Sequence, residues 1–278
     1  MVVGVTEPEV LYHYTDAAGL LGIIRSHTIW ATDAEFLNDA QEMKFGRAEV
    51  LEALRTKARR LDASGVGFGT EEESRSAVIR SVIDHLHPRE GGVTNQQWHA
   101  AYVACFCEDG DLLSQWRGYA PGGGYAIGFT TSGLRNLSDP GGTVAGPSLV
   151  RVRYGNEALI AAVSRVEAEV GERATGHPGV TGFDESARYV IPVLASIKHA
   201  AFAEEREWRV VVSSDRVGVQ FRSTAVSIAP YLDLPFTASS ITSVVVGPGP
   251  FPELREDAVR RLVPESVEVR RSAAPFRG

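Results

Sequence analysis

Two short segments decide how this chain is read: Leu11-Tyr12-His13-Tyr14-Thr15 and Phe202-Ala203-Glu204-Glu205-Arg206-Glu207-Trp208-Arg209. Both are predicted to be strands, and both carry polar groups that a structural strand rarely needs. They lie far apart in sequence, so only the fold could bring them together. We expect a site where a histidine flanked by tyrosines meets a pair of carboxylates, with His13 and Glu207 approaching one another across a cleft.

The first segment presents its side chains alternately on two faces. Leu11, His13 and Thr15 share one face, while Tyr12 and Tyr14 share the other. His13 could hydrogen-bond a ribose hydroxyl or an amide of a ligand, with Thr15 beside it. The alternative is a core histidine whose ring is satisfied by backbone carbonyls, as buried polar groups usually are.

The second segment places two carboxylates close together. If it is extended, Glu205, Glu207 and Arg209 share one face. Neighbouring carboxylates repel each other unless a cation or a ligand lies between them. One interpretation is a Glu–Arg ladder on an exposed strand face. The other is that Glu207 stabilises an oxocarbenium-like centre or binds a ribose 2′-hydroxyl, as carboxylates do in glycosidic cleavage.

A third segment, from Leu112 to Tyr119, concentrates a hydroxyl, an amide, two aromatic rings and a guanidinium. Arg117 could form forked bonds to a phosphate, and Trp116 could stack on a base or a nicotinamide ring. The alternative is a structural corner, in which Arg117 binds carbonyls and Trp116 fills the core.

Composition excludes several classes of protein. The chain has 278 residues, 44% of them hydrophobic, and a net charge of -7, so it carries no overall electrostatic signature of a nucleic-acid-binding protein. Its two cysteines, Cys105 and Cys107, are too close along one strand for an ordinary disulfide, which fits a reducing compartment. No signal peptide or membrane-spanning run is evident, and the seven histidines lack metal-ligand spacing. We therefore expect a cytoplasmic protein without a metal site.

Helices interrupt strands irregularly along the chain, which predicts an α+β fold rather than a doubly wound sheet. Asn38 or Asp39 is expected to cap a helix that ends near residue 61, and a second helix is expected at 71–87. Together these predict a single α+β domain over residues 1–278, with a helical insertion at about 38–90. Further helices are expected at 157–170, 184–202 and 252–262, and strands at 102–107, 125–129, 149–154, 207–212, 219–221, 226–228, 241–246 and 267–271.

Several ordered motifs resemble those of the bacterial DUF2971 family, over nearly the whole chain. The family name implies no activity. The motifs are Leu11-Tyr12-His13-Tyr14-Thr15, Trp30-Ala31-Thr32 with Leu37-Asn38-Asp39, Cys105-Phe106, Leu113-Ser114-Gln115-Trp116-Arg117, Gly124-Tyr125-Ala126-Ile127-Gly128-Phe129, Lys198-His199 with Glu207-Trp208-Arg209, and Val245-Val246-Gly247-Pro248.

A looser resemblance links the H-Y-T and E-x-E segments to the first and third motifs of ADP-ribosyltransferases, which bind NAD in a cleft between two small antiparallel sheets. The resemblance implies an ADP-ribosyltransferase-like fold of split antiparallel β-sheets with helical insertions. It implies that His13 holds NAD, that Glu207 is the catalytic glutamate and that Glu205 is the upstream carboxylate. Ser114 and Tyr125 are the candidates for the middle motif of that family.

The leading hypothesis is an enzyme that cleaves the nicotinamide–ribose bond of NAD, with protein, nucleic acid, a small molecule or water as acceptor. A role in defence, as a toxin or in stress would fit the broader group. One rival is a non-catalytic domain that senses a nucleotide in the same cleft, and another is a nucleic-acid-processing enzyme. The predicted catalytic residues are Glu207, Glu205 and His13, and the predicted NAD-binding residues are His13, Tyr14, Thr15, Ser114, Trp116, Arg117 and Tyr125.

Overall fold

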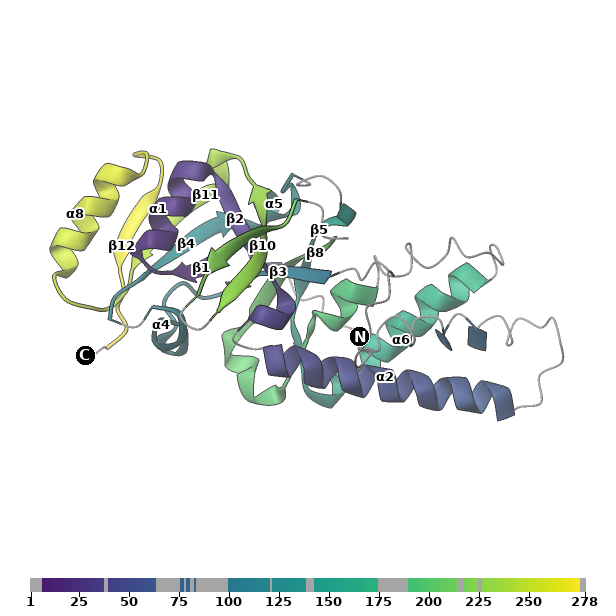
Figure 1. Cartoon of the computed structure of the whole chain (residues 1–278). Coiled ribbons are helices and arrows are strands. Elements are labelled where there is room, and N and C mark those ends of the chain that lie inside the picture. The colour runs from purple at the N-terminus through teal and green to yellow at the C-terminus, as the bar shows by residue number, and fades with distance from the viewer. Residues whose placement is uncertain are drawn as a thin grey trace.

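The protein is a mixed α+β structure, as the sequence predicted, and it is built around one large, mostly antiparallel sheet rather than the two small sheets that the looser resemblance implied (Figure 1). The computed structural model describes residues 7–37, 40–63, 76–77, 79–80, 83, 100–120, 122–138, 143–174, 190–214, 218–224 and 227–275. The predicted cap at Asn38 or Asp39 lies outside the described residues, as do most of the predicted helix at 71–87 and part of the one at 184–202.

The large sheet has ten strands. Its main path runs β12-β11-β4-β1-β3-β2-β10-β9, and β8 and β5 extend it from β3. Every pairing in it is antiparallel except that of β11 with β12. The strands are β1 (Val10–Thr15), β2 (Thr28–Asp33), β3 (Ala100–Cys107), β4 (Tyr125–Thr130), β5 (Thr143–Arg151), β8 (Glu207–Ser214), β9 (Gln220–Ser223), β10 (Ile228–Pro235), β11 (Ile241–Val246) and β12 (Glu268–Arg271).

The pairing between β1 and β3 is short. Strand β1 pairs with β4 along its whole length but with β3 only through Tyr12 and Cys107. Strand β3 pairs with β8 from end to end, and with β2 only through Val103 and Tyr102. Strands β1 and β2 therefore share one edge of β3 and diverge from each other. This divergence leaves the middle of that edge, around Cys105, without a paired strand.

Short helices connect the strands and cover the sheet. Helix α1 (Ala17–Ser26) joins the two diverging strands, and its first turn is capped by Asp16, whose side chain accepts a hydrogen bond of 2.7 Å from the Gly19 amide. Its buried face consists of Leu20 and Ile23. The remaining short helices are η1 (Ala34–Phe36), α4 (Leu113–Tyr119), α5 (Thr131–Arg135), η3 (Ala238–Ser240) and α8 (Pro252–Leu262).

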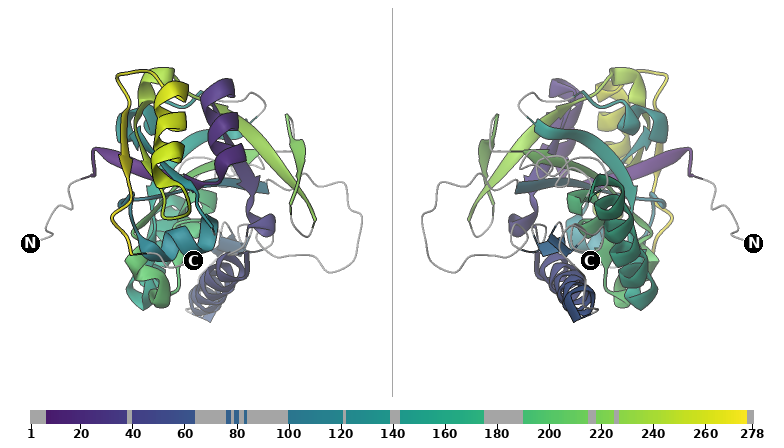
Figure 2. Two further views of the ribbon diagram at one scale, coloured as in Figure 1. Left: turned by 90° about the vertical axis from the view of Figure 1, so that its left-hand side faces the viewer. Right: turned by 90° about the vertical axis from the view of Figure 1, so that its right-hand side faces the viewer.

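Two long helices form a separate layer beside the sheet (Figures 1 and 2). Helix α2 (Ala40–Ala63) comes from the predicted insertion, but its partner α6 (Gly155–Ala174) comes from the middle of the chain. The helical layer is therefore assembled from two distant segments. Short strands β6 (Arg153–Tyr154) and β7 (Ile197–Lys198) pair in parallel beside it.

The core has two main parts. The first lies on one face of the large sheet and includes Leu11, Phe129 and Val210; the second lies among the long helices and includes Leu54 and Val166. Burying each such side chain stabilises the fold by about 1.5–3 kcal/mol relative to exposure. Between these parts, the largest fully buried side chains include two cations, Lys198 and Arg209. A buried cation needs an anionic or hydrogen-bonding partner, because burial removes its hydration.

Candidate functional site

A pocket of about 40 Å³ lies beside the single pairing of β1 with β3, and it is lined by residues from both Leu11–Thr15 and Phe202–Arg209. This is room for roughly three water molecules. His13 and Glu207 both line it, as predicted. Its lining consists of Tyr12, His13 and Tyr14 from β1, Cys105, Phe106 and Cys107 from β3, Gln115 and Tyr119 from α4, and Glu205 and Glu207.

Glu207 is the first residue of β8 and is 4% exposed. Arg209 donates to both of its oxygens, from Nε to Oε1 at 2.6 Å and from Nη2 to Oε2 at 2.9 Å. Burial alone raises the pKa of Glu207, but Arg209 and then Lys198 outweigh that effect and hold the pKa below its ordinary value. The pocket therefore contains a carboxylate that stays ionised although it is buried.

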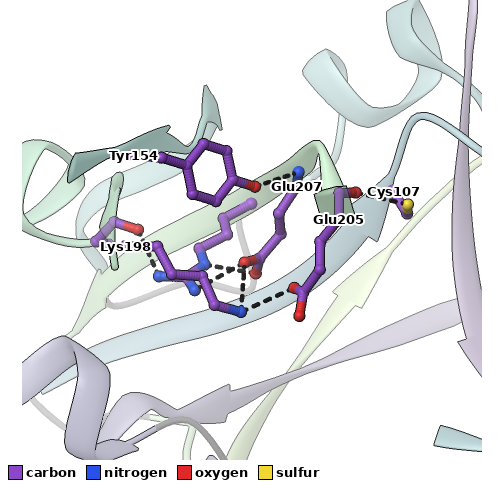
Figure 3. Close-up of polar contacts among 7 residues, drawn as sticks. Cys107, Tyr154, Lys198, Glu205 and Glu207 are labelled. Carbon is purple, nitrogen blue, oxygen red and sulfur yellow. Dashed lines mark hydrogen bonds and ion pairs between the residues drawn. The ribbon is translucent and has the colours of Figure 1, made fainter. Parts of the chain in front are cut away.

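Lys198 lies between the two glutamates (Figure 3). Its Nζ donates to Glu205 at 2.8 Å and to Glu207 at 3.2 Å, and it lies 4.8 Å from the centre of the Phe202 ring. The sequence predicted that a cation or a ligand lies between the carboxylates, with Arg209 as the candidate cation. Lys198 was missed as a site residue, and its presence in the Lys198-His199 motif was the one signal that pointed to it.

Glu205 does not lie on the strand, which corrects the prediction of an extended segment. It ends a 3₁₀ helix, η2 (Ala200–Glu205), and Arg206 follows in the left-handed conformation with φ 44°. That turn separates Glu205 from β8, so the two glutamates meet through Lys198 rather than through strand alternation. The interpretation as an exposed Glu–Arg ladder is also wrong, because Glu207 and Arg209 are both buried.

The backbone near Glu207 is held from a second direction. Its amide donates to the hydroxyl of Tyr154 at 2.8 Å, as Figure 3 shows. Burial raises the pKa of Tyr154 to about 12, so that hydroxyl stays protonated at neutral pH. The position of the carboxylate thus depends on residues from β6, β7 and β8 together.

His13 is hydrogen-bonded to the backbone, as a structural histidine would be, and it also lines the pocket, as a ligand-binding histidine would. Its Nδ1 lies 2.9 Å from the Cys105 carbonyl oxygen, and its ring packs against Phe106 with the centroids 5.6 Å apart. A carbonyl only accepts, so Nδ1 carries the proton and the neutral ring keeps Nε2 as an acceptor. Burial lowers the pKa of His13 more than this hydrogen bond raises it, which favours the neutral ring.

Tyr14 lines the pocket, but its hydroxyl is used by the fold. The hydroxyl donates to the Asp109 carbonyl at 2.8 Å and accepts from the Leu112 amide at 2.9 Å. Burial raises the pKa of Tyr14 well above its ordinary range. Tyr14 therefore fixes the start of α4 against β1, and only its ring is left to face a ligand.

Helix α4 presents different residues from those expected. Trp116 is 1% exposed, and its indole N–H donates to Asp111 at 2.8 Å, so it fills the core and offers no free ring face for stacking. Arg117 is exposed and does not line the pocket, and neither does Ser114. Gln115 and Tyr119 line it instead. These two were missed, although their four-residue spacing places them on one face of a helix.

Thr15 and Tyr125 lie opposite each other on β1 and β4, outside the pocket. Tyr125 is 8% exposed, and the Arg255 guanidinium lies 5.1 Å from the centre of its ring. The predicted stacking of Tyr125 on a nicotinamide in the cleft is therefore corrected, because its ring is packed elsewhere. Thr15 does not share the pocket with its neighbour His13.

Both cysteines are free thiols in the pocket wall. The Cys107 thiol donates to the Glu205 carbonyl at 2.7 Å, and burial raises its pKa to about 12. Burial and the nearby Glu207 carboxylate raise the pKa of Cys105 well above its ordinary value. Both thiols are protonated at neutral pH, so neither is activated as a nucleophile.

The described residues contain neither a metal-binding cluster nor a membrane-spanning helix. Within them, no group of three or more histidine, cysteine, aspartate or glutamate side chains is placed to hold a metal ion. No helix among the described residues is long and apolar enough to cross a membrane.

Comparison with known proteins identifies one family. A family model described as "Protein of unknown function (DUF2971)" matches residues 115–210, a stretch that begins in α4 and ends in β8. The match includes Gln115, Lys198, Glu205 and Glu207. No curated protein and no solved structure matches the chain. The match over residues 115–210 supports, for this part of the chain, the resemblance drawn from the sequence motifs.

Proposed function

We propose that the pocket binds the nicotinamide end of NAD and that the protein cleaves the nicotinamide–ribose bond, passing ADP-ribose to an acceptor or to water. One observation carries the proposal. His13 and a buried, ionised Glu207 come from distant segments and line the same pocket, at the point where the antiparallel sheet divides.

The proposed chemistry needs a fixed negative charge. When the glycosidic bond breaks, the leaving nicotinamide keeps the bonding electron pair and positive charge develops on the ribose. A carboxylate held in place beforehand stabilises that charge, and Glu207 is held by Arg209 and Lys198 in a largely water-free setting. The acceptor then bonds to the ribose and loses its proton. In this proposal the Glu205 side chain, which is 15% exposed, orients that acceptor.

His13 and the aromatic residues have binding roles in this proposal. The Nε2 atom of His13 accepts a hydrogen bond from a ribose hydroxyl, and the rings of Tyr12 and Phe106 contact the planar base. The pocket is small, so the rest of the dinucleotide lies outside it. Arg117, exposed on α4, remains a candidate for the pyrophosphate.

A specific observation favours a second candidate function, a domain that binds a nucleotide without cleaving it. Both oxygens of Glu207 are already engaged by cations, and the side chain is 95% removed from solvent. A carboxylate used in this way also stabilises the fold without any catalytic role. Both functions require NAD binding, and only the enzyme releases nicotinamide.

The test is to incubate the purified protein with NAD and to measure released nicotinamide by chromatography, together with NAD binding by calorimetry. Wild type should release nicotinamide, and His13→Asn should weaken NAD binding. Glu205→Gln should spare hydrolysis more than transfer. Glu204→Gln is the control, because Glu204 is exposed and does not line the pocket. Binding without release would favour the sensor, and the absence of both would refute the proposal.

A further inference from the structure

The side chain of Gln115 is placed as a ligand-binding group would be. It is 7% exposed and lines the pocket from α4. Within the part of the chain that the structure describes, its amide forms no hydrogen bond and is not among the buried polar atoms sealed from solvent. The amide is therefore accessible to solvent at a residue that lines the pocket. An amide without a protein partner at such a position is available to donate to and accept from a ligand.

The surroundings of Gln115 restrict the chemistry of that partner. A glutamine amide has an N–H₂ donor and a C=O acceptor side by side, so it pairs most completely with a group that offers both. Glu205 and Glu207 line the same pocket, whereas Lys198 and Arg209, the cations that pair with them, do not line it, so an anionic ligand would meet carboxylates in the pocket wall without a cation beside it. Tyr12 and Phe106 line it as well, which suits a planar ring. A primary carboxamide on an aromatic ring meets all of these conditions, whereas the corresponding carboxylate does not.

We propose that Gln115 is a specificity-determining residue that binds the primary carboxamide of the ligand, through one hydrogen bond to its C=O and one from its N–H₂. This inference rests on the proposed function, and it specifies that the nicotinamide form of the dinucleotide is accepted and the nicotinic acid form is rejected. A pocket of about 40 Å³ has room for the carboxamide and the edge of its ring.

The test separates binding from turnover by using fragments. Nicotinamide and nicotinic acid are titrated separately, by calorimetry or ligand-observed magnetic resonance, into the full chain of wild type, Gln115→Leu and Gly118→Ala, each with a thermal melt. Gly118 is the matched control, because it lies in the same helix and an added methyl group would meet no atom within 4 Å. Wild type should bind nicotinamide at least about tenfold more tightly than nicotinic acid, which corresponds to about 1.4 kcal/mol.

Gln115→Leu should lose about tenfold in nicotinamide affinity without a lower melting temperature, because it replaces an unpaired amide with an apolar group of similar size. Gly118→Ala should bind like wild type. The inference is overturned if wild type binds neither fragment, if it prefers nicotinic acid, or if Gln115→Leu binds nicotinamide as wild type does.

The same variants distinguish the failure of this inference from the failure of the proposed function. If nicotinamide binds through Gln115 but NAD is never cleaved, the carboxamide site stands and the enzymatic proposal fails. If NAD is cleaved and Gln115→Leu still discriminates against the nicotinic acid dinucleotide as wild type does, the enzyme stands and the role of Gln115 is refuted.

Discussion

Replacing Glu207 by glutamine should destabilise the protein, in addition to any effect on activity. The carboxylate is 4% exposed and accepts hydrogen bonds from Arg209 and Lys198. Removing one partner of a buried ion pair typically costs about 3–5 kcal/mol, because the remaining charge stays buried. Here the lower end applies, since Lys198 keeps Glu205 and Arg209 keeps the Ala195 carbonyl at 2.8 Å. We expect a loss of about 3 kcal/mol.

This loss converts into a measurable shift of the melting temperature. Unfolding entropy is about 2.1 cal/mol/K per residue near 60 °C, so a chain of 278 residues has about 0.6 kcal/mol/K if it unfolds as one unit. A loss of about 3 kcal/mol then lowers the melting temperature by about 5 °C. Differential scanning calorimetry measures the shift directly, and urea unfolding gives the free energy independently.

Two further variants make the test of Glu207→Gln specific. Glu204→Gln changes an exposed glutamate three positions earlier and should stay within about 0.5 kcal/mol of wild type. The double change Glu207→Gln with Arg209→Met removes the cation that the first change leaves without a carboxylate, so it should be less destabilised than the sum of its single changes. If Glu207→Gln melts within about 1 °C of wild type, then the carboxylate is not the buried, doubly paired group described here.

The remaining predictions concern pH, thiol reactivity, Arg117 and catalysis. The pKa of Glu207 is lowered in the folded state, so the stability that separates wild type from Glu207→Gln should be fully present above the ordinary value of 4.5 and should vanish as the pH falls through the lowered pKa; acid-range urea unfolding tests this. Cys107 and Cys105 should react with iodoacetamide at pH 7.5 far more slowly than a free thiol until urea unfolds the chain, and rapid labelling of the native protein would contradict the raised pKa of each. Arg117→Lys should leave the melting temperature unchanged because Arg117 is exposed, and weaker NAD binding in calorimetry would assign it to the pyrophosphate. If wild type cleaves NAD, the folded fraction of Glu207→Gln should be at least about a hundredfold slower, and an equal rate would exclude Glu207 as the charge-stabilising group.

Local patterns predicted much of the secondary structure. The alternation in residues 10–15 and the apolar run at 102–107 correspond to β1 and β3, and the apolar positions Leu20 and Ile23 are the buried face of α1. These features depend on neighbours within one strand or one helical turn, which the sequence displays directly. The segment at 202–206 was misjudged, because the left-handed Arg206 that ends η2 is held by contacts, including an ion pair with Asp109, that no local pattern displays.

The packing of the helical layer and the burial of the α4 side chains could not be predicted from local sequence patterns. Helix α6 was predicted as a helix, but nothing in its sequence indicated that it would pack on α2 from the first part of the chain. From its sequence, Trp116 was equally compatible with core packing and with ligand stacking. In the structure its indole N–H donates to Asp111, and the side chain is part of the core. Burial is a property of the assembled fold, so a residue type alone does not determine it.

The sequence by itself determined that His13 and Glu207 belong to segments with more polar groups than strands need, and that these segments should meet. Only the tertiary structure decided what surrounds them. It placed Lys198 between two glutamates and directed Gln115 into the pocket that Tyr119 also lines. The physical reason is that the energetic effect of a charge or an amide depends on its partners and its exposure, and the pocket brings together His13, Gln115 and Glu207, which lie far apart in the chain.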